Sequence, residues 1–178
     1  GETKKGLEAV RRNFQRSLIE LLRAHHLFDG KIMLIHCASF ERLDLDLLAN
    51  ARVGVVLTPR SVMQKETETP RIAEYLGRGI PIVLASDWGV SDPFDVMRSY
   101  VELARSQGVD IPNGSALIRM MTLEAAKAVG VDDLAGSLEV GKKADITLVD
   151  ISGARCAGVK GRDINSLLSS FLQESSSR

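Results

Sequence analysis

Three apolar runs between residues 31 and 87 decide the fold: KIMLI (31–35), VGVVL (53–57) and PIVLA (81–85). Each run is rich in β-branched residues, does not alternate polar with apolar positions, and is bounded by polar or turn-forming residues. Continuous runs of this kind are typical of strands buried on both faces of a parallel sheet. The sequence therefore predicts three central parallel strands.

The intervals between these runs each have the length of one helix. Residues 41–51 and 71–79 supply the two helices, so the order is strand, helix, strand, helix, strand. The first run ends at His36, and the third continues through Ser86 into Asp87. Because α/β folds bind ligands at the carboxyl ends of their parallel strands, we expect His36 and Asp87 to face one pocket.

The composition argues against several classes of protein. The 178 residues are 44% hydrophobic, enough for the core of one domain, or of one domain and part of a second. Basic and acidic residues number 23 each, so the charge gives no reason to expect nucleic acid or a membrane surface as a partner. No apolar run approaches the roughly 18 residues of a membrane span. Two distant cysteines, Cys37 and Cys156, fit a reduced cytoplasmic protein better than a disulfide framework.

Further elements are expected on both sides of the three strands. The chain begins at Gly1 without Met, and we expect it to be a piece of a larger protein. Apolar residues spaced three and four apart predict one helix over residues 3–26. Asp92 and Pro93 are expected to cap and start a helix over residues 94–107. The prediction is completed by helices over 115–121 and 123–129, the latter with Thr122 as its candidate cap, a fourth strand over 146–149 and a short helix over 163–172.

Five segments of the chain, in order, resemble the carboxyl-terminal half of the amidohydrolase superfamily. They read LIHC (34–37), TPRS (58–61), LASD (84–87), MMTLEAAKAVG (120–130) and GSLEVGKKADI (136–146). The last segment is the most specific, because few unrelated proteins contain Gly-Ser-Leu-Glu-Val-Gly-Lys-x-Ala-Asp. The resemblance covers residues 1–150, and it is strongest to the group of guanine, cytosine and S-adenosylhomocysteine deaminases and triazine hydrolases.

This resemblance implies a fold and an assembly. Residues 1–135 would form part of a TIM (β/α)8 barrel, namely strands six to eight with their helices. Residues 136–178 would return to the carboxyl-terminal piece of a small β-sandwich domain and end in a tail. Barrel strands one to five would lie outside this chain, and the intact enzyme would be a homo-oligomer.

The resemblance also implies roles for single residues. Asp87 matches the aspartate after strand eight, which ligates a divalent metal and takes the proton from the metal-bound water. His36 matches the histidine after strand six, which orients that water or the substrate. Glu2 matches a glutamate that carries a proton to the substrate ring, and Trp88 and Arg60 are assigned to substrate binding.

The implied reaction is hydrolysis of a C–N bond, that is, deamination of an aminated heterocycle such as a purine, a pyrimidine or a triazine. Bound Zn²⁺ or Fe²⁺ lowers the pKa of water from about 16 to about 7, which supplies hydroxide at neutral pH. Carboxylates beside it can accept and return protons. Dechlorination and ring-amide opening share this chemistry, and the sequence chooses neither among these reactions nor between zinc and iron.

Two departures from the family pattern concern the site. A full metal site needs a His-x-His element, whereas the three histidines here are His25, His26 and His36. His25 and His26 fall at the end of the first predicted helix and are interpreted as surface residues. Most metal ligands are therefore expected outside this chain. In addition, Val62 follows Ser61 where the family often has asparagine, so the usual support of the loop after strand seven is not predicted.

Each of these residues also has a purely structural interpretation. Asp87 can cap the turn that follows it, His36 can be a hydrogen-bonded core histidine, Glu2 can be a solvated carboxylate, and Arg60 can lie on the rim. Cys37 is interpreted as a small buried hydrophobic residue, because no base is placed to activate its thiol.

Three hypotheses for the whole chain follow. It is part of a catalytic amidohydrolase, or a truncated homologue that binds or supports other molecules without catalysis, or a stand-alone open α/β domain that binds a ligand at its strand ends. Detection of bound zinc or iron would favour the first hypothesis over the second. Covered sheet edges would favour the third, and exposed edges would count against it.

Overall fold

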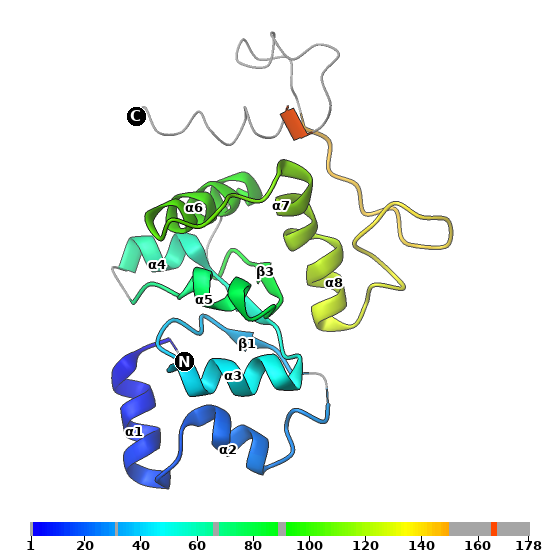
Figure 1. The fold of residues 1–178 in the computed structure, drawn as a ribbon. Helices are drawn as coiled ribbons and strands as arrows, with labels where there is room; N and C mark the ends of the chain where they lie inside the picture. Colours follow the sequence, from blue (N-terminus) through cyan, green and yellow to red (C-terminus); the bar gives the residue numbers. More distant parts are fainter. Residues whose placement is uncertain (1, 31, 66–67, 89–91, 150–164, 167–178) are drawn as a thin grey trace.

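The computed structural model describes residues 2–30, 32–65, 68–88, 92–149 and 165–166 (Figure 1). At its centre is a sheet of three parallel strands, β1 (Leu34–Ile35), β2 (Val55–Leu57) and β3 (Ile82–Leu84), in the order β1-β2-β3. Each strand lies inside one of the three apolar runs, so the predicted strands and their parallel arrangement are confirmed. In the observed register, Val55 lies opposite Leu34 on one side and Ile82 on the other.

Helices alternate with the strands as the sequence predicts. They are α3 (Arg42–Ala51), α4 (Pro59–Lys65), α5 (Ile72–Gly77) and α6 (Pro93–Ser106), followed by α7 (Gly114–Met121) and α8 (Leu123–Val129). All but α4 were predicted, with ends that differ by a few residues. The α4 helix begins directly after the second strand at Pro59, because proline is favoured at the first helical position. None of the helices within the described ranges has the length and apolar character needed to cross a membrane.

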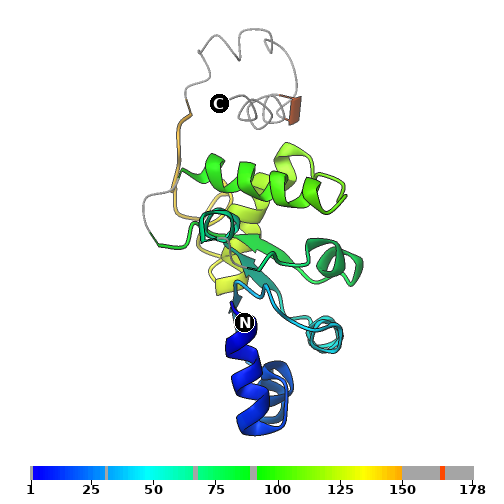
Figure 2. The same ribbon diagram turned by 90° about the vertical axis from the view of Figure 1, so that its left-hand side faces the viewer.

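One face of the sheet carries the core. Side chains alternate between the two faces along a strand, and those of Val55, Leu57, Ile82 and Leu84 belong to the core cluster. The cluster also contains buried residues of α3, α4, α5 and α6, together with Ile19 of α2 and Leu117 of α7. The α7 and α8 helices contact β3. Figures 1 and 2 show α1 and α2 at the end of the molecule nearest α3, and α6 and α7 at the opposite end.

The predicted single helix over residues 3–26 is wrong, because the structure has two helices there, α1 (Lys4–Phe14) and α2 (Leu18–Ala24). Gln15 ends α1 in the left-handed conformation, with φ of 55°. Ser17 starts α2 with a capping box, in which its hydroxyl accepts from the N–H of Glu20 and the Glu20 carboxylate accepts from the N–H of Ser17. Apolar residues continue at spacings of three and four across this break, so the spacing alone did not predict it.

One further prediction fails nearer the carboxyl end. Residues 146–149 are not in a strand, because the three-stranded sheet does not extend to them in the part of the chain that the structure describes. Leu148 is accordingly 92% exposed. Thr122 is the N-cap residue of α8, as predicted, but its side chain makes no capping hydrogen bond, because its hydroxyl donates to the carbonyl oxygen of Ile118 at 2.9 Å. The helix predicted over 163–172 lies outside the described residues, apart from residues 165–166.

The outer edges of the sheet are open. Within the described ranges, β1 and β3 each pair with β2 only. Beside and within β1, Met33 and Ile35 are 44% and 45% exposed although both are large and apolar. An open parallel sheet with exposed apolar side chains counts against the hypothesis of a self-contained α/β domain.

Candidate functional site

Three polar residues lie where the three strands end. His36 follows β1 directly, Thr58 follows β2 directly, and Asp87 follows β3 after two intervening residues. The hydrogen bonds between β1 and β2 continue to His36, because its backbone N–H donates to the carbonyl oxygen of Val56 at 2.9 Å. Since the strands are parallel, the structure brings these residues to the same edge of the sheet, with Thr58 on the strand between those of His36 and Asp87.

The backbone adopts an unusual conformation at both outer strand ends. His36 and Cys37 have φ of 69° and 52°, and Asp87 has φ of 64°. This left-handed region costs on the order of 1–3 kcal/mol for a residue other than glycine, so it persists only where the surroundings hold it. Such residues are concentrated at functional sites. The geometry therefore favours a site over an ordinary turn at these positions.

The His36 ring is held by Thr58. The Nδ1 atom of His36 lies 2.9 Å from the Oγ1 atom of Thr58, a residue that is only 1% exposed. A threonine directly before a helix usually accepts a hydrogen bond from the helix backbone, whereas this hydroxyl bonds to an imidazole. Because Nδ1 is occupied, Nε2 is the ring nitrogen that remains for a ligand.

The turn after His36 is anchored from the core. The hydroxyl of Tyr75 in α5 donates to the carbonyl oxygen of Cys37, and both residues are 1% exposed. Burial raises the pKa of the Cys37 thiol to about 12, so the reactive thiolate does not form near neutral pH. This agrees with the interpretation of Cys37 as a buried hydrophobic residue. Tyr75 therefore fixes the backbone beside His36.

Asp87 and Trp88 are adjacent but differ in exposure. The Oδ2 atom of Asp87 is buried, whereas Trp88 is 77% exposed. Burial of this oxygen restricts the Asp87 side chain more than exposure on the surface would. The exposed indole is accessible to a ligand, and substrate binding by Trp88 stays a prediction.

Arg60 is directed toward α6. Its Nη1 atom lies 3.8 Å from the Oδ2 atom of Asp95, and Arg98, one turn further along α6, pairs with the same carboxylate. Asp95 thus lies between two guanidinium groups in the first turn of α6. This ion pair matches the rim interpretation of Arg60, and its role in substrate binding stays a prediction.

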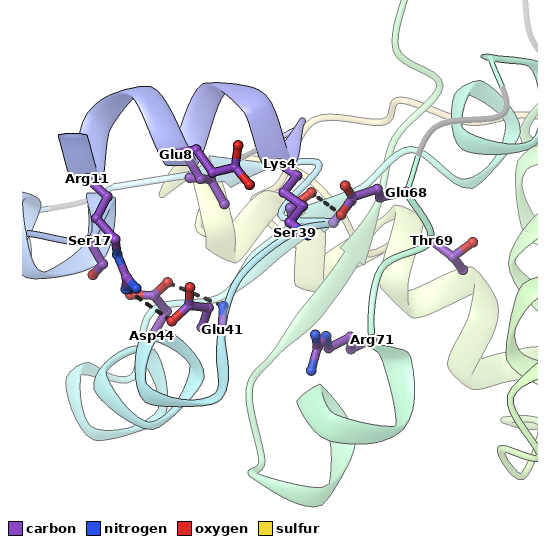
Figure 3. Close-up of a pocket in the computed structure, with 12 residues that line it drawn as sticks. Lys4, Glu8, Arg11, Ser17, Ser39, Glu41, Asp44, Glu68, Thr69 and Arg71 are labelled. Atoms are coloured by element: carbon purple, nitrogen blue, oxygen red, sulfur yellow. Dashed lines mark hydrogen bonds and ion pairs between the residues drawn. The ribbon is translucent and has the colours of Figure 1, made fainter. Parts of the chain in front are cut away.

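Glu2 lies two residues before α1, whose first residue, Lys4, lines a cavity of about 550 Å³. Lys4 lines this cavity together with Ser39, which follows β1, and Glu68, which follows α4 (Figure 3). The Ser39 hydroxyl donates to the Glu68 carboxylate at 2.6 Å. The start of α1 therefore lies near Ser39, three residues after His36, and the role of Glu2 stays a prediction.

Other groups in this cavity hold the helices together. Arg11 of α1 donates to Glu41, the residue before α3, at 3.0 Å (Figure 3). Asp44 of α3 is 4% exposed and accepts from the backbone N–H of Glu41 at 3.4 Å. Burial raises the pKa of Asp44, and a hydrogen bond with the Ser17 side chain opposes this shift. Arg11 and Glu41 form an ion pair, and Asp44 bonds to a backbone N–H and to Ser17, so these groups have a structural role.

The described residues do not form a metal site by themselves. Among them, no three His, Cys, Asp or Glu side chains come together in a group that could hold a metal ion. Asp87 is the predicted ligand in this chain, and a single carboxylate does not fill the four positions that Zn²⁺ takes. A complete metal centre therefore requires ligands from outside the described residues.

Sequence reasoning missed Thr58 and Tyr75. Thr58 carries the same signal that pointed to His36 and Asp87, because it is the polar residue at the end of an apolar run. Tyr75 gave no such signal, since its hydroxyl bonds to a carbonyl group 38 residues earlier in the chain. No local pattern reveals a contact of that kind.

Comparison with known proteins links these features to a family. The model of the amidohydrolase family matches residues 1–171. A 5-methylthioadenosine/S-adenosylhomocysteine deaminase from Moorella thermoacetica is 29% identical over 157 residues, which cover 84% of this chain and 36% of the relative. This chain therefore spans little more than a third of the length of that curated relative.

Two solved structures have a similar fold. Guanine deaminase from E. coli matches with a TM-score of 0.82 and 17% identity, over 96% of this chain and 42% of that protein. An adenosine deaminase from Xanthomonas campestris with bound zinc matches with a TM-score of 0.82 and 22% identity, over 94% of this chain and 39% of that protein. The three parallel strands and their helices therefore match a portion of these larger structures.

Proposed function

Since this chain belongs to the amidohydrolase family, we propose that it forms part of a metal-dependent enzyme that hydrolyses a C–N bond of an aminated heterocycle. The relatives described above are named as deaminases of 5-methylthioadenosine and S-adenosylhomocysteine, of guanine, and of adenosine. The proposed substrates are therefore purines, pyrimidines or triazines that carry an exocyclic amine. The observation that carries the proposal is the position of His36, Thr58 and Asp87 at the ends of three adjacent parallel strands.

The proposed roles follow from the chemistry of each side chain. The Asp87 carboxylate accepts the proton of the attacking water, and its buried Oδ2 atom limits its movement. His36 orients the polar group that reacts, because the bond to Thr58 fixes its ring. Glu2 returns a proton to the heterocycle from the opposite side. Trp88 and Arg60 complete the substrate site.

A divalent metal, zinc or iron, is part of this proposal. Bound metal would lower the pKa of water to about 7 and so provide hydroxide under neutral conditions. Asp87 is the ligand that we assign to this chain, and the other ligands belong to the rest of the protein.

We further propose that residues 1–135 and 136–178 belong to different domains. Residues 1–135 contain the strands and helices of the barrel portion, and residues 136–178 return to a small β domain. Val140 and Leu148 are apolar and almost fully exposed within the described part of this second segment. Such exposure is expected where strands of another segment normally cover the chain.

A non-catalytic homologue is the second candidate function. The described ranges contain no three-residue metal cluster, so a protein whose other parts supply no metal ligands would not catalyse the reaction. Such a protein would keep the fold and the polar residues at the strand ends but would bind a ligand without hydrolysing it.

The test uses the full-length protein that carries this chain. Zinc and iron are measured by elemental analysis, and ammonia release is followed with 5-methylthioadenosine, S-adenosylhomocysteine, adenosine, guanine and an aminated triazine. We expect about one equivalent of metal and turnover of at least one of these compounds. We also expect Asp87→Asn to lower turnover by about 100-fold or more, as for loss of a proton acceptor.

Asp133→Asn is the matched control, because Asp133 is an exposed aspartate away from the strand ends. It should leave turnover unchanged. A protein that contains no zinc or iron and releases no ammonia from any of the five compounds would overturn the enzymatic proposal and leave the non-catalytic one.

A further inference from the structure

We propose that Thr58 holds His36 as the tautomer protonated on Nε2, so that His36 offers an N–H donor, and not a lone pair, to the molecule bound at the strand ends. The inference deepens the proposed function and rests on it, because it assigns the chemistry of His36 in that site. It concerns one direct contact, the 2.9 Å hydrogen bond between Nδ1 of His36 and Oγ1 of Thr58.

The argument begins with the surroundings of the Thr58 hydroxyl. Thr58 is 1% exposed, so its hydroxyl cannot turn to bulk water. Within the residues that the structure describes, the bond to His36 is the one hydrogen bond of this hydroxyl. A hydroxyl has one proton to donate and two lone pairs that accept. The direction of this bond therefore decides whether the hydroxyl proton has a partner.

The two directions differ in cost. If the Thr58 hydroxyl donates to Nδ1, its proton is satisfied and only lone pairs remain without partners. If Nδ1–H donated to Oγ1 instead, the buried hydroxyl proton would have no acceptor among the described groups. An unsatisfied buried donor is more costly than an unsatisfied second lone pair. The hydroxyl therefore donates, Nδ1 accepts, and the ring proton of neutral His36 resides on Nε2.

The backbone keeps the ring in this arrangement. The N–H of His36 donates to the carbonyl oxygen of Val56 at 2.9 Å, and Tyr75 holds the next carbonyl group, that of Cys37. Both bonds stabilise the left-handed turn that carries the His36 side chain. These bonds therefore fix the backbone position from which the imidazole reaches Thr58.

The tautomer determines what His36 can bind. A neutral imidazole with its proton on Nε2 donates from that atom and has no lone pair there for a metal ion or for a proton. It therefore selects a ligand with a hydrogen-bond acceptor at this position, such as a carbonyl oxygen, a hydroxyl oxygen or an unprotonated ring nitrogen. In the proposed reaction, His36 is an orienting donor, and the base must be another group.

Nitrogen-15 NMR of the imidazoles tests this assignment without an activity measurement. The spectra are recorded on the full-length protein under basic conditions, and His36→Gln identifies the signals of His36. His25 is exposed and serves as an internal reference. We expect the proton of His36 on Nε2, with Nδ1 as the acceptor of a hydrogen bond. A proton found mainly on Nδ1 would overturn the proposal.

Two substitutions at Thr58 and one control sharpen the test. Thr58→Val keeps the shape of the side chain but removes the hydroxyl, so the ratio of the two tautomers should fall by about fivefold, as expected for one lost hydrogen bond. Thr58→Ser restores a hydroxyl and should restore the ratio. Thr122→Val removes a hydroxyl that bonds to Ile118 and should leave His36 unchanged. An unchanged ratio in Thr58→Val would also overturn the proposal.

The inference and the proposed function can fail separately. If His36 carries its proton on Nε2 and responds to Thr58→Val, but the protein hydrolyses no aminated heterocycle, the positioning role stands and the reaction is wrong. If the protein does hydrolyse such a compound but His36 carries its proton on Nδ1, the reaction stands and the assignment of His36 as a donor is overturned.

Discussion

Two buried tyrosines of this protein differ in a single hydrogen bond. Tyr75 donates to the carbonyl oxygen of Cys37, whereas the hydroxyl of Tyr100, in α6, has no hydrogen-bond partner among the described residues. Tyr75→Phe removes the hydroxyl donor and leaves the buried carbonyl group of Cys37 without this hydrogen bond. We therefore expect the free energy of unfolding to fall by about 1–3 kcal/mol in urea titrations.

Tyr100→Phe is the matched control for this experiment. It removes a buried hydroxyl that has no hydrogen-bond partner in the described part of the chain, so stability should stay within about 0.5 kcal/mol of the wild type or increase. Equal losses in the two variants would show that the bond to Cys37 does not hold the turn beside His36.

Asp44 makes stability depend on pH in an unusual direction. Burial raises the pKa of its carboxyl group above the usual 3.8, so the folded state binds the proton more tightly than the unfolded state. The contribution of Asp44 to stability is therefore present at low pH and is lost as the pH rises through the raised pKa. We expect Asp44→Asn to become more stable relative to the wild type between pH 4 and pH 7, as measured by urea unfolding.

An exposed neutral residue of the same helix provides the comparison. Asn50→Ala should change stability by the same amount at every pH, because neither side chain carries a titratable group. If the stability difference between Asp44→Asn and the wild type stayed constant with pH, or shrank toward neutral pH, burial would not be the dominant influence on Asp44.

At the level of elements, Gln107 connects two helices. It follows α6 and uses both ends of its amide on the start of α5, since Nε2 donates to the carbonyl oxygen of Pro70 at 2.8 Å and Oε1 accepts from the N–H of Ile72 at 3.0 Å. We expect Gln107→Ala to lower the free energy of unfolding by about 1–3 kcal/mol, the sum of two hydrogen bonds. Gln64→Ala, on the exposed side of α4, should change it by less than about 0.5 kcal/mol. Similar values for both variants would contradict the role of Gln107.

The sequence predicted elements wherever local pattern and tertiary packing agree. Continuous apolar runs gave the three strands, and the Asp92-Pro93 pair gave the start of α6, where the Asp92 side chain accepts from the N–H of Phe94 at 2.8 Å. The break at Gln15 could not be predicted from the apolar spacing, because α1 and α2 are both amphipathic and their spacing continues across it. The strand expected at 146–149 failed for another reason, since pairing depends on a neighbour and not on the segment itself.

The same distinction applies to the site. His36 and Asp87 could be found because a polar residue after an apolar run marks the carboxyl end of a strand. The bond between His36 and Thr58 depends on which strands are neighbours, and the anchor from Tyr75 depends on how α5 packs. Both are properties of the tertiary structure, so neither was accessible from a local pattern.

At the scale of the whole molecule, the open sheet is the main feature. The three strands occur in sequence order, and β1 and β3 have no second neighbour within the described ranges. A barrel needs strands on both sides of such a group. This arrangement agrees with a chain that spans 36–42% of its larger relatives.

This openness leads to a prediction about a protein made of these 178 residues alone. Ile35 in β1 is 45% exposed, and an apolar strand at a sheet edge favours pairing with another chain. We expect such a protein to self-associate in sedimentation experiments as its concentration rises. Ile35→Lys should shift it toward the monomer, because a charged side chain on an edge strand disfavours pairing between chains.

The control for this prediction is Leu43→Lys. Leu43 in α3 is 72% exposed, more than Ile35, but it lies on a helix and not at the sheet edge. If the open edge drives association, Leu43→Lys should associate like the unsubstituted chain although it adds the same charge. A chain that stays monomeric at all concentrations without any substitution would instead mean that the sheet edges are protected, and the hypothesis of a self-contained α/β domain would regain its support.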